Sequence, residues 1–100
     1  MKAYRINPEK AAIEEIDVAN LADIVEQIGF DTIESDAIGT DGDRLYFDEE
    51  CFLRGGGVRF QIDTVIPVSG RAIVVGTTTD GSLCDVAADI EKLRGRIKYL

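Results

Sequence analysis

Two observations predict an α+β fold for this chain, with a single mainly antiparallel sheet of about five or six strands and two short helices packed on one face. Segments rich in β-branched residues outnumber helical segments, and short turns join most of them, which places sequence neighbours side by side in a sheet. The length of 100 residues and the hydrophobic content of 45% suit one domain, residues 1–100, with one core.

The first third of the chain is predicted to form a β-hairpin and then a helix. Residues 3–7 and 12–18 have strand character, and Pro8 begins the turn between them. Asn20 precedes apolar residues at helical spacing and can cap the first turn, so a helix is expected to start there. Gly29 suits the residue that ends this helix.

The middle of the chain is predicted to form a second hairpin. Residues 31–38 and 44–48 have strand character and flank an Asp-Gly turn. Alternation along the return strand directs Leu45 and Phe47 into the core and Tyr46 outward with the charges.

The second half of the chain is predicted to supply the remaining strands and one more helix. Residues 58–62 alternate cleanly after a loop of three glycines, and the β-branched run 71–78 is typical of a central strand buried on both faces. Asp85 is expected to cap a helix that runs toward Leu93. The tail from Arg96 is expected to form a last strand or an extended segment.

Composition removes most catalytic and metal chemistry. The chain has no histidine, and Cys51 and Cys84 do not form a Cys-x-x-Cys pair, so zinc, copper and iron–sulfur sites and histidine-based mechanisms lack their groups. We expect reduced thiols rather than a disulfide, no cofactor and no enzymatic activity. The longest aliphatic run is far shorter than a membrane span, so we expect a cytoplasmic protein without membrane contact.

The acid-rich segment 40–50 lacks the spacing of a calcium-binding EF-hand loop. With Gly42 at the required glycine, loop positions 1 and 3 fall on Ala37 and Gly39, which offer no side-chain oxygen. We therefore expect no metal site. A hairpin with a hydrated outer face is the simplest account of this segment, and an acidic binding surface is the alternative.

The net charge of −8 is unevenly distributed. Residues 9–50 hold fourteen acids and two bases, whereas residues 51–100 hold five acids and seven bases. This asymmetry favours a protein partner with a basic surface and argues against direct nucleic-acid binding. The expected partner-binding acids are Glu14, Glu15, Asp17, Asp36, Asp41, Asp43, Asp48, Glu49 and Glu50. A docking patch for an acidic partner, or for the acidic half of a second copy, is expected at Lys92, Arg94, Arg96 and Lys98.

Short motifs of the last third resemble those of one known family. A Gly-x-Ala strand runs into a Gly-Thr-x-x-x-Gly turn, then a short helix and a terminal apolar pattern. The residues concerned are Gly70, Ala72, Gly76, Thr77, Gly81, 89–93, Ile97, Tyr99 and Leu100. They resemble the end of a family of small proteins, a domain of unknown function found on bacterial plasmids and in phage genomes. Residues 4–18 and 28–50 are similar to the family's opening hairpin and middle, and residues 53–66 match least. The resemblance implies a fold and a genomic context but no catalytic residue.

These observations favour a non-enzymatic acidic binding protein. The mobile-element origin that the resemblance implies suggests an inhibitor or nucleic-acid decoy, whose carboxylates occupy a basic site on a host protein. A self-assembling structural or regulatory module, with a homodimer as its simplest form, is the alternative. A small-ligand binder or an enzyme is the third hypothesis, which a deep pocket with converging polar groups would favour.

Overall fold

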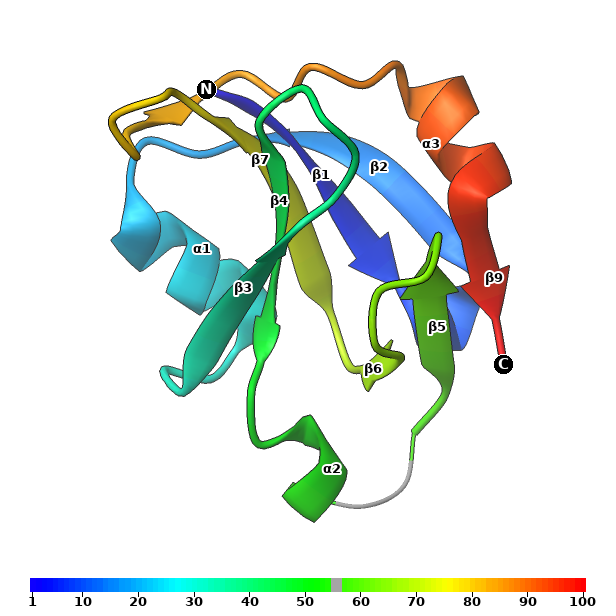
Figure 1. Cartoon of the computed structure of the whole chain (residues 1–100). Helices are drawn as coiled ribbons and strands as arrows, with labels where there is room; N and C mark the ends of the chain where they lie inside the picture. The colour runs from blue at the N-terminus through cyan, green and yellow to red at the C-terminus, as the bar shows by residue number, and fades with distance from the viewer. Residues whose placement is uncertain (55–56) are drawn as a thin grey trace.

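The strand order β2-β1-β7-β4-β3 defines the main sheet of the computed structural model, which describes residues 1–54 and 57–100 (Figure 1). All of its pairings are antiparallel. Its strands are β1 (Lys2–Asn7), β2 (Ala12–Asp17), β3 (Ile33–Ala37), β4 (Asp43–Asp48) and β7 (Ala72–Thr77), with the short β8 (Leu83–Cys84) beside β7. The α+β class and the mainly antiparallel sheet are therefore confirmed.

A smaller antiparallel sheet has the order β6-β5-β9. Its strands are β5 (Arg59–Ile62), β6 (Val68–Ser69) and β9 (Ile97–Tyr99). The helices are the 3₁₀ turn η1 (Pro8–Lys10), α1 (Leu21–Ile28), α2 (Cys51–Arg54) and α3 (Ile90–Arg96). The sequence predicts neither β6 nor α2, because elements of two and four residues are too short to show a period.

The central strand β7 joins the two halves of the core. Ala72 and Val74 face one side of the sheet, whereas Ile73 and Val75 face the other, and all four are fully buried. This confirms the predicted central strand. A strand that is apolar on both faces needs cover from both sides.

The two faces of the main sheet are covered by different elements. Ile24 and Ile28 of α1 pack on the face of Ile73 and Val75. On the opposite face, Leu93 of α3 packs together with the buried residues of the small sheet. Figure 1 shows α1 on one side of the sheet and α3, β5 and β9 on the other. The two longer helices therefore lie on opposite faces rather than on one, because β7 needs cover on both.

Helix α1 begins and ends where the sequence predicts. The Asn20 side chain accepts a hydrogen bond from the Asp23 N–H at 3.1 Å, and the Asp23 carboxylate accepts one from the Ala19 N–H at 2.7 Å. This reciprocal arrangement satisfies two donors that the helix itself leaves free. Gly29 ends the helix with a φ of 92°, a left-handed conformation that glycine adopts without strain.

Helix α3 starts later than the sequence predicts. Asp89, not Asp85, is its N-cap, and the Asp89 carboxylate accepts two backbone N–H groups of the first turn. The segment before it is held extended by β1: the Val86 N–H donates to the Lys2 oxygen at 2.9 Å, and Asp85 accepts from the Lys2 N–H at 2.8 Å. Pairing with β1 therefore overrides the local capping signal, while the predicted final strand is present as β9.

The β3–β4 hairpin differs from its prediction at one side chain. Leu45 and Phe47 are buried in the core, as expected. Tyr46 does not point into solvent: it is half-buried, because α1 covers its face of the sheet with Ile24 and Ile28. The turn also docks on β7, since a Cβ at Gly42 would lie 2.5 Å from the Thr77 carbonyl oxygen.

Three further predictions have brief outcomes. Cys51 and Cys84 are both free thiols. The predicted glycine loop includes Gly55 and Gly56, which lie outside the described residues. Within the two described ranges, no helix is long and apolar enough to cross a membrane.

Candidate functional site

The predicted acidic residues lie on two opposite edges of the main sheet. Strand β2 is at one end of the strand order and β3 at the other, with β1, β7 and β4 between them. At about 4.8 Å per strand, the two edges are roughly 19 Å apart. Glu14, Glu15 and Asp17 belong to β2, and Asp36 belongs to β3. The nine acids therefore do not form one contiguous surface.

The acids of β2 are largely paired with neighbouring cations. Glu14 forms a salt bridge with Arg5 of the adjacent strand, and the Asp17 carboxylate lies 3.1 Å from the N-terminal ammonium of Met1. Of the three, only Glu15 has neither a hydrogen bond nor a salt bridge to the described residues. Most of the charge at this edge is thus compensated within the chain.

Asp43 is buried and has a structural role. Its side chain is 3% exposed, and its two carboxylate oxygens accept hydrogen bonds from the Ala87 N–H at 2.8 Å and the Ala88 N–H at 3.0 Å. These bonds attach the segment before α3 to β4. Asp43 is therefore not available to a partner.

Asp48 is also buried, at the end of β4. Its carboxylate accepts hydrogen bonds from Thr32 Oγ1 at 2.6 Å, Arg54 Nε at 2.6 Å and the Glu50 N–H at 3.1 Å. Burial raises the pKa of this carboxyl, but the hydrogen bonds from Arg54 and Thr32 outweigh burial and lower the pKa overall. Asp48 thus fixes α2 against the start of β3, while Glu50 lies 3.5 Å from Arg54 in the same cluster.

The unpaired acids gather along β3. Among the described residues, no hydrogen bond or salt bridge engages the side chain of Asp36, Asp41 or Glu49. The same holds for Asp31 and Glu34, which the sequence interpretation did not single out. Asp41 lies apart in the β3–β4 turn. We call the other four, Asp31, Glu34, Asp36 and Glu49, the β3 acidic edge.

The backbone of β3 is open on one side. The Ile38 N–H donates to the Asp43 oxygen at 3.0 Å, which sets the phase of the β3–β4 ladder. Because hydrogen-bonded and non-bonded pairs alternate in an antiparallel ladder, the backbone groups of Ile33, Ser35 and Ala37 point away from β4. They form an edge that another extended segment can join.

One outward backbone group of β3 already has a partner. Arg44 donates from Nη2 to the Ser35 carbonyl oxygen at 3.0 Å and from Nε to the Ser35 hydroxyl at 3.0 Å. A basic side chain over an edge strand limits indiscriminate pairing with other chains. The outward backbone groups of β3 are therefore free to pair, except at Ser35, where the Arg44 side chain covers the carbonyl oxygen.

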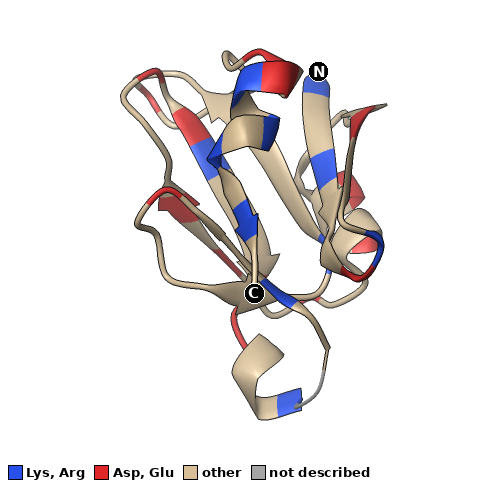
Figure 2. Cartoon of the chain, turned by 90° about the vertical axis from the view of Figure 1, so that its right-hand side faces the viewer, with Lys and Arg blue, Asp and Glu red and all other residues tan. Residues whose placement is uncertain are grey.

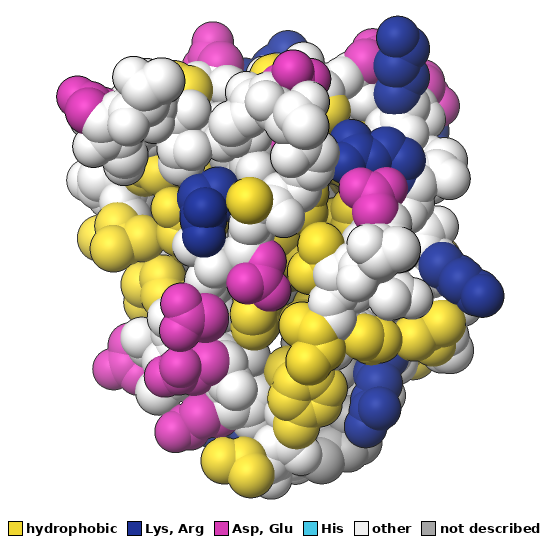
Figure 3. Space-filling model, in the orientation of Figure 1, with side chains coloured by type: hydrophobic (Ala, Val, Ile, Leu, Met, Phe, Trp, Pro, Cys, Tyr) yellow, Lys and Arg dark blue, Asp and Glu magenta, His cyan; other side chains and the backbone are white. Residues whose placement is uncertain are grey.

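Exposed apolar side chains lie at one end of the β3 acidic edge. Phe30 is 41% exposed, Phe52 44% and Leu53 83%. The Arg54 guanidinium connects them to β3, because it lies 3.7 Å from the Phe30 ring centroid and donates to Thr32 Oγ1 at 3.2 Å. Figure 3 shows acidic side chains over β3 with hydrophobic ones beside them over α2. We call Phe30, Phe52 and Leu53 the α2 apolar patch.

The predicted basic docking patch is divided between α3 and β9 (Figure 2). Arg94 pairs within α3 at 2.6 Å, and Arg96 pairs with Asp63 at 2.6 Å. In the described ranges, Lys92 and Lys98 have no salt-bridge partner. The four cations do not share one face of an extended segment, because α3 continues through Arg96.

No family model, no curated protein and no solved structure matches this chain. The resemblance to the plasmid and phage family therefore stays a prediction.

Proposed function

We propose that this protein is a non-enzymatic binding protein whose β3 acidic edge occupies a basic surface of another protein. The observation that supports this most is the contrast in pairing. Two of the three acids of β2, Glu14 and Asp17, form salt bridges, whereas the four acids of the β3 acidic edge form none among the described residues. Unpaired carboxylates on one strand edge attract a basic partner at long range.

The α2 apolar patch can supply the binding affinity that exposed charges alone do not provide. Exposed charge pairs add little affinity, because solvent and salt screen them. Exposed aromatic and aliphatic side chains beside the charges can be buried in a complex, and aromatic residues are enriched among interface hot spots. Phe52 and Leu53 therefore suit the anchor of the interface, and the β3 acidic edge suits its rim.

The spacing of the carboxylates does not discriminate between a basic protein segment and a nucleic-acid-binding site as the target. Glu34 and Asp36 are two residues apart on one face of β3, which separates them by about 6.8 Å along the strand. One DNA strand presents a charge about every 3.4 Å along the helix axis, but successive phosphates also wind around that axis and are therefore farther apart in space. An inhibitor or decoy role on a nucleic-acid-binding host protein is the narrower form of the proposal, and it requires that nucleic acid compete with this protein for the partner.

Self-assembly is the second candidate, since β3 offers an open edge. Pairing two β3 strands antiparallel would bring Glu34 and Asp36 of both copies together, and opposed like charges destabilise a sheet. High salt would then promote a dimer, whereas it would weaken a complex with a basic partner.

A pull-down with two matched variants tests the proposal. The first variant carries Glu34→Lys, Asp36→Lys and Glu49→Lys; the control carries Glu14→Lys, Glu15→Lys and Asp17→Lys, with the same change in net charge. We expect wild type and the β2 control to retain one partner at low salt, and the β3 variant to lose it.

Retention should also fall steeply as salt is raised, and Leu53→Ser should weaken it at every salt concentration. The proposal is wrong if the β3 variant retains the partner as well as the control does, or if retention is independent of salt.

A further inference from the structure

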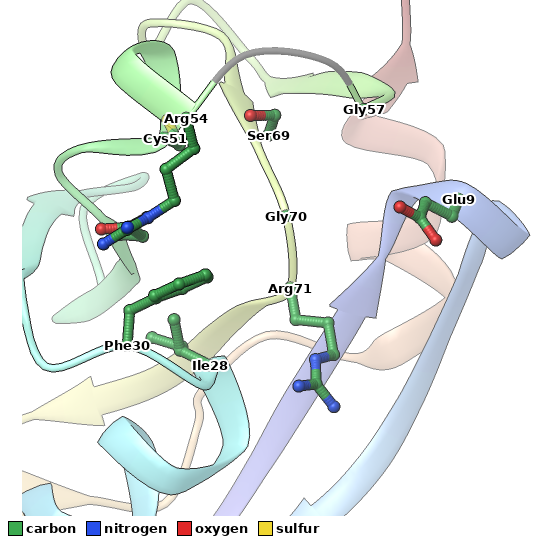
Figure 4. Close-up of a pocket in the computed structure, with 10 residues that line it drawn as sticks. Glu9, Ile28, Phe30, Cys51, Arg54, Gly57, Ser69, Gly70 and Arg71 are labelled. Carbon is green, nitrogen blue, oxygen red and sulfur yellow. The ribbon is translucent and has the colours of Figure 1, made fainter.

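A cavity of about 260 Å³ opens between α1, α2 and the start of β7. Its lining includes Ile28, Phe30, Cys51, Ser69 and Arg71. An adjoining hollow shares several of these residues and extends toward η1, so the two form one groove. Figure 4 shows Arg54 and Phe30 on one side of it and Arg71 and Glu9 on the other.

Arg71 supplies this groove with a positive charge that nothing in the described ranges neutralises, since no hydrogen bond or salt bridge engages its side chain. Arg54 differs, because its guanidinium is held by Asp48 at 2.6 Å. Gly29 gives Arg71 room: a Cβ at Gly29 would lie 3.1 Å from Arg71 Nη2. The guanidinium thus lies by the C-terminal end of α1, and a helix-end contact alone is the competing explanation for it.

Ser69 lies at another part of the lining, beside α2 (Figure 4). The residue is only 8% exposed, but no buried side-chain oxygen of the described residues lacks a hydrogen-bond partner. Ser69 therefore shapes the cavity and is not an orphaned polar group that calls for a ligand.

The charges and apolar walls define the class of ligand. Asp48 is already neutralised by Arg54, so the uncompensated charges of the lining are one cation, Arg71, and one anion, Glu9. A single negative charge complements Arg71, whereas a second one would be repelled by Glu9. The guanidinium fork matches a carboxylate, and Ile28 and Phe30 provide an apolar wall.

We propose that this groove binds a small organic monocarboxylate, with its carboxylate on the Arg71 guanidinium and its apolar body against Ile28 and Phe30. The acid can be a free small molecule or the C-terminal carboxylate of a peptide, which share this chemistry. The site uses none of the unpaired acids of β3 and shares only Phe30 with the α2 apolar patch, so the proposal does not rest on the proposed protein-binding function.

Titration of the ¹⁵N-labelled full chain with 3-phenylpropionate, followed by NMR, tests the proposal. We expect saturable shifts of the amide signals of Phe30 and of residues 69–72, with a dissociation constant on the order of 1 mM for so small a ligand. The uncharged 3-phenylpropionamide and inorganic phosphate should each bind at least about tenfold more weakly. N-acetyl-phenylalanine, which resembles a peptide C-terminus, identifies the source: tighter binding than 3-phenylpropionate favours a peptide, and weaker binding a free acid.

Two variants complete the test. Arg71→Gln should abolish the shifts, and Lys10→Gln, which removes a nearby exposed cation outside the lining, should leave binding unchanged. Equal binding of the acid and its amide overturns the proposal. So does an absence of saturable shifts in wild type, even if Arg71→Gln lowers the melting temperature, because Arg71 then serves only the end of α1.

Discussion

The two edges of the main sheet, β2 and β3, both carry acidic residues, but the residues that stand opposite those acids differ. At the β2 edge, the cross-strand register places Glu14 opposite Arg5. At the β3 edge, Glu34 and Asp36 stand opposite apolar residues of β4. The one base that β4 offers, Arg44, contacts Ser35 instead.

This difference separates carboxylates that are already paired within the chain from carboxylates that are free to bind a partner. A carboxylate that already has a cation gains little from a partner, because the partner must first displace that cation. A carboxylate without one keeps its full attraction for a basic surface. Of the acidic stretch 9–50, the part along β3 is therefore the better site for a partner.

Removal of a buried acid should have the largest effect on stability. Asp48→Ala leaves Thr32 Oγ1 and the Glu50 N–H without their acceptor and Arg54 without its counter-charge. We expect the free energy of unfolding to fall by about 2–4 kcal/mol, measured by urea denaturation. A loss below that of an exposed acid would contradict the structural role assigned to Asp48.

The same carboxylate should make stability depend on pH in the acid range. Its pKa is lower in the folded state than the unfolded value of about 3.9. Its contribution is therefore present above that value and is lost as the pH falls through the lower, folded pKa. The difference in melting temperature between wild type and Asp48→Asn should narrow below about pH 4. A difference that stays constant to lower pH would contradict this assignment.

Two similar turns should respond differently to the same substitution. Gly42 and Gly81 both follow Thr-Asp and both have a φ near 90°. A Cβ at Gly42 would meet the Thr77 oxygen at 2.5 Å, whereas a Cβ at Gly81 would meet nothing within 4 Å. We expect Gly42→Ala to cost about 1–3 kcal/mol more than Gly81→Ala, measured by thermal unfolding. Equal losses would show that the β3–β4 turn is not docked on β7.

Neutralising one exposed acid on each edge should give the smallest and most specific difference. Glu14→Gln removes the salt bridge to Arg5 and should cost about 0.2–1 kcal/mol. Glu34→Gln removes no pairing and should change stability by less than about 0.5 kcal/mol in either direction. Raising the salt concentration should shrink the first effect. The reverse ranking would mean that the β3 acids are not free.

Elements that depend on nearby residues could be predicted from the sequence. The caps of α1 and the double-sided burial of β7 follow from residues within one short window. The start of α3 could not be predicted, because the partner that holds Asp85 is Lys2, at the other end of the chain. The assignment of both helices to one face failed for a related reason, since which face α3 covers depends on the small sheet.

The sequence predicted that the candidate site is acidic, but it did not predict where in the fold the available acids lie. Charge counting identifies the acidic stretch. Asp43 lies inside this stretch, yet its carboxylate is not available to a partner, because it accepts hydrogen bonds from the Ala87 and Ala88 N–H groups. Register decides which acids have a cation opposite, and strand order decides which share an edge. Arg71 gave no signal in the sequence, because only the fold brings it to one groove with Ile28 and Phe30.

Mapping where a basic extended peptide binds tests the central claim most directly. The ¹⁵N-labelled protein is titrated with a short peptide of alternating lysine and threonine residues. At low salt, we predict that the amide signals of Ile33, Ser35 and Ala37 shift and become protected from hydrogen exchange, while those of Ile13 and Glu15 at the β2 edge stay in place. Shifts at both edges to the same extent, or at β2 alone, would contradict the claim that unpaired charge along β3 forms the binding surface.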